Sequence, residues 1–92
     1  MMEREFGHRV IKDPLEFKRM AVQIRREIAK RELDTRYLEI EVYHGVCYLR
    51  GRLGPMGKRP DWDLKKEIAS IIDMIRFKFG ISNVVADVRA LE

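Results

Sequence analysis

The sequence predicts an α+β fold: a two-layer sandwich in which two helices cover one face of a three-stranded mixed sheet. Two runs of β-branched and aromatic residues flank His44 and Gly45, and such alternation around a short turn is typical of a β-hairpin. Two stretches carry apolar residues at three- and four-residue spacing and therefore predict amphipathic helices. A final alternating segment, residues 81–91, predicts the last strand. The expected order is helix, strand, strand, helix, strand.

The first helix is expected to follow Asp13 as its N-cap, with Pro14 at the first helical position. It should end near residues 32–34, and its apolar stripe should face the core. That stripe consists of Phe17, Met20, Ala21, Ile24 and Ile28. Residues 1–12 show little periodicity and are expected to be a flexible N-terminal arm, ahead of a single domain over residues 13–92.

One register of the hairpin separates an apolar face from a mixed face. With His44 and Gly45 in the turn, Val42 faces Cys47, and the other apolar side chains share their side of the sheet. A shift of one residue would exchange the two faces, so the pattern specifies the register. The mixed face then carries Tyr37, Glu39, Glu41, Tyr43, Val46, Tyr48, Arg50 and Arg52.

The second half of the chain predicts a loop, a helix and a strand. Residues 54–60 contain two Gly and two Pro and are expected to be irregular. Asp61 is the expected N-cap of the second helix, and Gly80 should end it. The core stripe of this helix is Leu64, Ile68, Ile71, Ile72, Ile75 and Phe79. The last strand should place Val84, Ala86, Val88 and Ala90 on one face and Val85, Asp87 and Arg89 on the other.

Composition limits the classes of function. The 92 residues make one small domain, and a net charge of +4 permits anionic partners without requiring them. Charged residues reach 37%, and few thermolabile amides accompany them, which is typical of a thermophilic source. The single cysteine, Cys47, excludes an internal disulfide and is expected to be a buried thiol. Without a signal peptide or membrane span, we expect a cytoplasmic protein, or an envelope-associated one if the chain is part of a larger protein.

Two short motifs resemble the BON domain, a small bacterial module named after osmotic-shock and nodulation proteins. Residues 45–53 (GVCYLRGRL) are similar to the family pattern Gly-Val-x-x-Leu-x-Gly-x-Val, in which Gly51 is the small partner opposite Leu38. Residues 80–84 (GISNV) are similar to the Gly-Val-x-x-Val that leads into its last strand. The resemblance spans residues 17–90 and implies a non-catalytic module that contacts phospholipid surfaces or other proteins. The missing export signal and the long basic connection before the second helix depart from the family.

The first candidate site is basic. Lys58 and Arg59 lie in the Gly- and Pro-rich loop, and Arg50 and Arg52 lie near the end of the second strand. Together they would form an anion-binding site for a phosphate or an anionic membrane, although a solvated loop explains the same residues. Residues 54–57 also have the GxxG spacing of K-homology RNA-binding domains, but there the motif joins two helices.

The mixed sheet face is the second candidate site. Tyr43 and Tyr48 would suit a protein interface, including self-association of the sheet. With Tyr37 and the arginines of this face they would also suit base stacking by a nucleic acid, although Glu39 and Glu41 would repel its phosphates. A plain solvated sheet remains the alternative.

The third candidate lies on the second helix, where Trp62, Met74 and Phe77 fall off the core stripe. If all three are exposed, they form a further protein interface; otherwise other parts of the chain cover them. His8 and His44 have no neighbouring nucleophile or ligand pattern that would support catalysis.

The residues therefore predict a non-enzymatic binding or assembly module without a cofactor or metal. Its expected partner is an anionic, phospholipid-like surface or a protein, including a second copy of the chain. The alternative is a small cytoplasmic nucleic-acid-binding domain that uses the tyrosines and arginines of the sheet.

Overall fold

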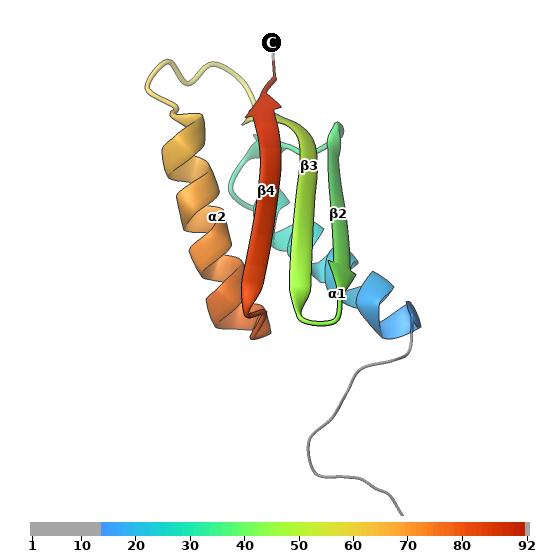
Figure 1. The fold of residues 1–92 in the computed structure, drawn as a ribbon. Helices are drawn as coiled ribbons and strands as arrows, with labels where there is room; N and C mark the ends of the chain where they lie inside the picture. Colours follow the sequence, from blue (N-terminus) through green and yellow to red (C-terminus); the bar gives the residue numbers. More distant parts are fainter. Residues whose placement is uncertain (1–13, 92) are drawn as a thin grey trace, which may run out of the picture.

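The computed structural model describes residues 14–91, in which two helices pack on one face of a four-stranded sheet (Figure 1). The α+β class and the order of helices and strands are as predicted. The expectations for residues 1–12 and for Asp13 lie outside the described residues. The elements are helix α1 (Pro14–Ala29), strands β1 (Leu33–Asp34), β2 (Leu38–Tyr43) and β3 (Val46–Pro55), helix α2 (Leu64–Phe79) and strand β4 (Asn83–Ala90).

Strand β3 lies at the centre of the sheet. It pairs antiparallel with β2 and parallel with β4, so the sheet is mixed. The hairpin register is the predicted one, with Tyr43 facing Val46 and Val42 facing Cys47 beside the turn. This register sends the apolar side chains of the hairpin toward the helices, as the alternation requires.

Positive φ angles occur where the hairpin turns and where β3 bends. His44 and Gly45 have φ of 47° and 79°, as a two-residue primed turn needs. Gly51 has φ of 120°, and a Cβ at this position would overlap the carbonyl oxygen of Tyr37. That oxygen accepts a hydrogen bond of 2.9 Å from the N–H of Arg52, so glycine permits this close approach of the two strands.

The fourth strand corrects the predicted three-stranded sheet. Gly54 and Pro55 were expected in a loop over residues 54–60, but they continue β3 and pair antiparallel with Asp34 and Leu33 of β1. The N–H of the next residue, Met56, donates to the carbonyl oxygen of Glu32, so the nitrogen of Pro55 points away from β1 and its missing donor costs no hydrogen bond with that strand. The irregular connection before α2 therefore covers residues 56–63, so it begins two residues later than the sequence suggested, and the N-cap at its end also lies two residues later.

Helix α1 ends earlier than expected. Its last helical residue is Ala29, whereas the sequence predicted an end near residues 32–34. The chain then forms a tight turn in which Glu32 adopts a left-handed φ of 62°, and this conformation cannot continue a helix.

Helix α2 has a different N-cap from the predicted one. The carboxylate of Asp63 accepts a hydrogen bond from the N–H of Lys65 at 2.9 Å, so Asp63 is the cap and Asp61 precedes it in the loop. Gly80 ends the helix in the left-handed conformation, as predicted.

The core lies between the two helices and one face of the sheet. Cys47 is fully buried, as expected, and burial raises the pKa of its thiol to about 11. Neither described helix is long and apolar enough to cross a membrane. The buried apolar residues are Phe17, Ile24, Ile28, Leu33, Leu38, Val42, Cys47, Leu49, Leu53, Ile71, Ile75 and Ile81.

Candidate functional site

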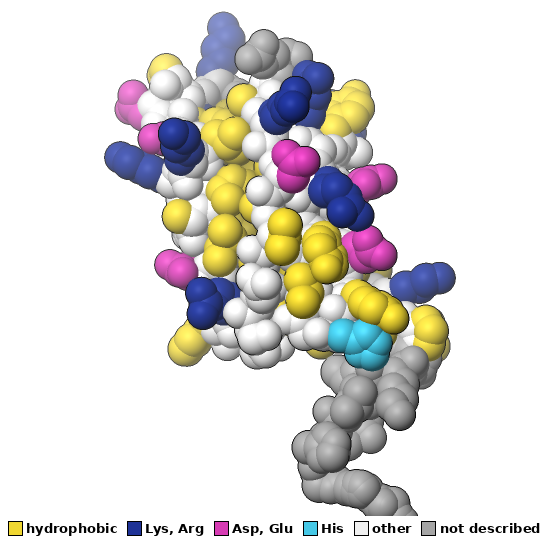
Figure 2. All heavy atoms as spheres, in the orientation of Figure 1, with side chains coloured by type: hydrophobic (Ala, Val, Ile, Leu, Met, Phe, Trp, Pro, Cys, Tyr) yellow, Lys and Arg dark blue, Asp and Glu magenta, His cyan; other side chains and the backbone are white. Residues whose placement is uncertain are grey.

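The face of the sheet opposite the helices is not covered by any other described element, and we call it the open face (Figures 1 and 2). Its side chains come from three strands and form rows that the strand registers define. Starting at the turn, the rows are Tyr43, Val46 and Asn83; Glu41, Tyr48 and Val85; Glu39, Arg50 and Asp87; and Arg52 and Arg89.

The half of the open face near the turn is apolar. Tyr43 and Val85 are 56% and 44% exposed, and Val46 and Tyr48 are half-buried between them. These four residues form the apolar patch, and Figure 2 shows hydrophobic side chains gathered on this part of the face. Adjacent exposed aromatic and branched side chains are enriched at protein interfaces.

The ring of Tyr43 is held by its neighbours. It meets the rings of His44 and Phe17 edge-on, with centroids 4.1 Å and 5.5 Å away. A shallow depression of about 520 Å³ lies beside them and is also lined by Pro14 and Lys18. Because Phe17 belongs to α1, the ring of Tyr43 reaches from the end of β2 toward the helix side and lies at the border of the apolar patch.

The middle of the open face carries charges of alternating sign around Arg50. Its guanidinium donates to Glu41 at 3.0 Å, lies 4.0 Å from Glu39 and sits 5.6 Å from the ring centre of Tyr48. Asp87 is its neighbour on β4. These exposed pairs contribute little to stability, but they occupy Arg50 with carboxylates and make this row unfavourable for an anion.

The end of the open face far from the turn is basic. Arg52 and Arg89 lie side by side in the β3–β4 register, and neither forms an ion pair with any residue from 14 to 91. Like charges on adjacent strand positions repel each other, so an acidic group bound between them would be stabilised.

The structure does not bring together the four basic residues that the sequence suggested as one anion site. Arg50 is paired with glutamates, and roughly 17 Å of strand separates it from the end of β3. Arg59 instead donates to the carbonyl oxygens of Arg31 and Glu32 at 3.4 Å and 3.5 Å. Lys58 is exposed in the loop.

Trp62, Met74 and Phe77 do not form one exposed patch. Trp62 precedes α2 and is half-buried, and its indole N–H donates to Glu67 at 2.9 Å. Both Trp62 and Met74 pack against the core. Trp62 and Met74 therefore act as structural residues in the described part of the chain.

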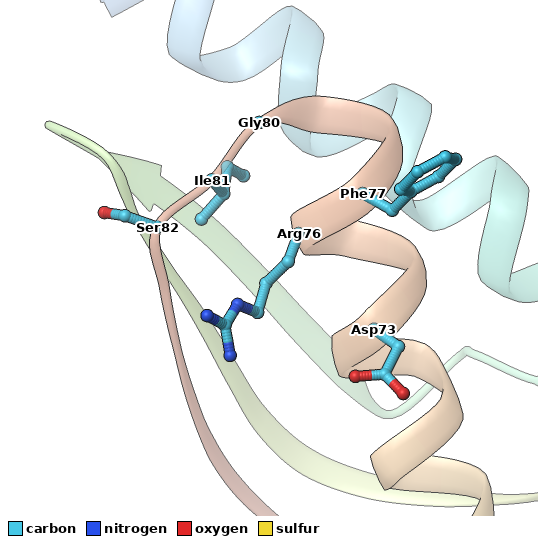
Figure 3. A pocket seen from close by; sticks show the side chains of 6 residues that line it. All are labelled: Asp73, Arg76, Phe77, Gly80, Ile81 and Ser82. Atoms are coloured by element: carbon cyan, nitrogen blue, oxygen red, sulfur yellow. The ribbon is translucent and has the colours of Figure 1, made fainter.

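Phe77 alone remains on the surface of α2, with 90% of its side chain exposed. It borders an open depression of about 590 Å³. Figure 3 shows Arg76 leaving α2 on the side of the segment that leads into β4, whereas the ring of Phe77 points to the other side. The remaining lining residues are Asp73, Gly80, Ile81 and Ser82.

Three residues of the open face were missed as site residues. Val85, Asp87 and Arg89 were expected to share one face of the last strand, but nothing connected them with the hairpin. The parallel register places them beside Tyr48, Arg50 and Arg52. The alternation of β4 indicated which face these side chains occupy. The register between β3 and β4 could not be read from the sequence, because it depends on the long connection through α2.

Comparison of the chain with protein-family models, with curated proteins and with solved structures gives no significant match. The resemblance to the BON domain, carried by residues 45–53 and 80–84, stays a prediction from those motifs.

Proposed function

We propose that this chain is a non-catalytic binding module that holds a protein partner on the open face of its sheet. The observation that carries the proposal is the apolar patch of Tyr43, Val46, Tyr48 and Val85 on a face that no described helix covers. A partner that buries this patch gains about 25 cal/mol for each Å² of apolar surface removed from water.

The charges of the open face favour a protein over a nucleic acid. Glu39, Glu41 and Asp87 surround Arg50, so a phosphate backbone lying along the strands would meet carboxylates in the middle of the face. A protein partner with a polar rim can match charges of both signs.

The non-catalytic assignment is supported by the titrating groups. Glu27, Asp34 and Arg36 have shifted pKa values because they form hydrogen-bonded ion pairs, and Cys47 has a raised pKa because it is buried in the core. Each shift therefore accompanies a structural contact rather than an arrangement of acid and base around a cleft.

Site-specific photo-cross-linking tests this proposal. A photoreactive amino acid at Val85 should give protein adducts in cells that produce the chain, and Tyr48→Glu in the same chain should remove them. Val22 is the matched control, because it is also an exposed valine, 51% accessible, but lies on α1. The same adducts from both positions, or none from Val85, would contradict the proposal.

A second candidate, binding of an anionic lipid surface, is favoured by the neighbours Arg52 and Arg89, which form no ion pair within residues 14–91. Each basic residue near such a surface contributes about 1 kcal/mol. Sedimentation with phosphatidylglycerol vesicles should be weakened by Arg52→Glu with Arg89→Glu, whereas Lys58→Glu with Arg59→Glu should have little effect. Equal binding to neutral vesicles would reject this candidate.

A further inference from the structure

We infer that β4 is a dimerisation edge: two copies of the chain join by antiparallel pairing of β4 with β4, about a two-fold axis at Val88. The two sheets would then form one continuous sheet with both open faces on the same side. This inference goes beyond the proposed function, because it concerns the strand edge and would hold whether or not the open face binds another protein.

The backbone of β4 has a free outer edge. Among the described strands, β4 pairs only with β3. The N–H groups of Asn83 and Leu91 point toward the hairpin, since they donate to the carbonyl oxygens of Gly45 and Leu53. Successive residues of a strand alternate in this direction. The outward N–H and C=O groups are therefore those of Val84, Ala86, Val88 and Ala90, and such an edge is a template for another strand.

At the opposite edge of the sheet, a side chain occupies one outward carbonyl, that of Leu38 at the start of β2. The carbonyl of Tyr37 accepts from Arg52 on β3, so the next carbonyl, that of Leu38, points outward. Arg25 of α1 donates to this oxygen at 2.6 Å and to the carbonyl oxygen of Thr35 at 2.7 Å. Arg25 thus covers the start of the β2 edge, whereas no side chain of residues 14–91 donates to an outward carbonyl of β4.

The core is also incomplete beside β4. Leu49 of β3 is 1% exposed, but its register partner on β4, Ala86, is exposed. Val84 and Val88 on the same side are only half-buried. Helix α2 therefore leaves the inner side of β4 partly in water. The two-fold arrangement would place a second copy's helix next to this surface.

The charges of β4 select the register. Asp87 and Arg89 project from the open face, and neither has an ion-pair partner in the described chain. A two-fold axis at Val88 places Asp87 of each copy opposite Arg89 of the other, at the closely spaced position of an antiparallel pair. An axis at Asp87 would oppose two carboxylates, and an axis at Ala86 would put Asp87 against Val85. The pairing at Val88 also gives Arg89 an acidic partner that offsets its repulsion with Arg52.

Charge reversal tests this arrangement by sedimentation equilibrium. The wild-type chain should change from 11.0 kDa to twice that mass as concentration rises. Asp87→Arg or Arg89→Asp alone should weaken the dimer roughly tenfold or more, because each creates two like-charge contacts across the axis. The double exchange should restore it. Glu39→Arg, the same change at the β2 edge, is the matched control.

Amide hydrogen exchange provides a second measurement that needs no variant. The amides of Ala86, Val88 and Ala90 should become protected as concentration rises, while Val85 and Asp87, which point toward β3, should be protected throughout. A monomer at all concentrations up to about 1 mM would overturn the inference. A dimer unaffected by either single reversal would equally overturn it, and the open-face proposal would survive both results.

Discussion

At the scale of single residues, Gly51 is the described glycine at which an added Cβ would make the closest contact. Its φ of 120° and the nearby carbonyl oxygen of Tyr37 leave no room for a Cβ. We expect Gly51→Ala to lower the free energy of unfolding by roughly 2–4 kcal/mol, because the strands must separate or the backbone must shift. Urea denaturation measures this loss.

Gly57 provides the control for that substitution. Its φ is also positive, at 78°, but no heavy atom lies within 4 Å of the place that a Cβ would take. Gly57→Ala should therefore cost only the conformational penalty of about 1–2 kcal/mol. Equal losses at Gly51 and Gly57 would show that steric overlap is not the cause.

Cys47 is expected to be unreactive in the folded protein. Burial raises the pKa of its thiol to about 11, whereas a cysteine in an unfolded chain ionises near pH 8.5. Its contribution to stability is therefore complete below about pH 8.5 and is lost as the pH rises toward the folded value. At pH 8, the fraction of Cys47 labelled by a disulfide reagent should rise with urea concentration in parallel with the fraction of unfolded protein. Rapid labelling of the native protein would contradict the burial.

At the scale of secondary-structure elements, the start of α2 depends on one of two neighbouring aspartates. Asp63→Ala should lower the free energy of unfolding by about 1 kcal/mol, because the N–H of Lys65 loses its side-chain acceptor. Asp61→Ala should change it by less than about 0.5 kcal/mol, since Asp61 is exposed in the loop. Thermal melts of both variants show which aspartate is the N-cap of α2. A larger loss of stability for Asp61→Ala than for Asp63→Ala would contradict the assignment of Asp63.

The elements that the sequence predicts correctly are those with local signals. The hairpin register follows from the turn at His44–Gly45 and from alternation on both sides of it. Strand β1 was missed because it has only two residues and pairs with Gly54 and Pro55, whose types favour a loop. Pairing between segments distant in the chain leaves no local pattern to read.

The candidate site was predictable only in part for the same reason. Tyr43 and Tyr48 were placed on the correct face by alternation, but their neighbour Val85 depends on a long-range parallel register. Trp62 was misleading because a side chain outside the helical stripe can still fold against the core from the preceding loop.

At the scale of the whole molecule, a carboxylate on α1 links the two helices. Glu27 accepts from Lys78 of α2 at 3.0 Å and from Lys30 at 3.2 Å, and these hydrogen bonds lower its pKa. Within the β1–β2 connection, Arg36 lowers the pKa of Asp34 in the same way.

Acid should therefore destabilise the fold. A carboxylate with a lowered folded pKa stabilises the protein above its unfolded value and loses that contribution as the pH falls through the folded value. We expect the melting temperature to decline below about pH 4. Glu27→Gln should melt at a lower temperature near pH 7 and show a weaker decline. An unchanged pH profile for this variant would contradict the linking role of Glu27.

One face of the sheet packs in the core and the other is exposed, and we propose that a partner binds the exposed face. NMR line broadening by a soluble paramagnetic probe measures this directly. In dilute solution, the signals of Val85 should broaden as strongly as those of Val22, while those of Leu49 and Ile71 should not. A cross-linked partner should protect Val85 but leave Val22 as broadened as before. Protection of Val85 without any partner, or broadening of Leu49, would contradict the account.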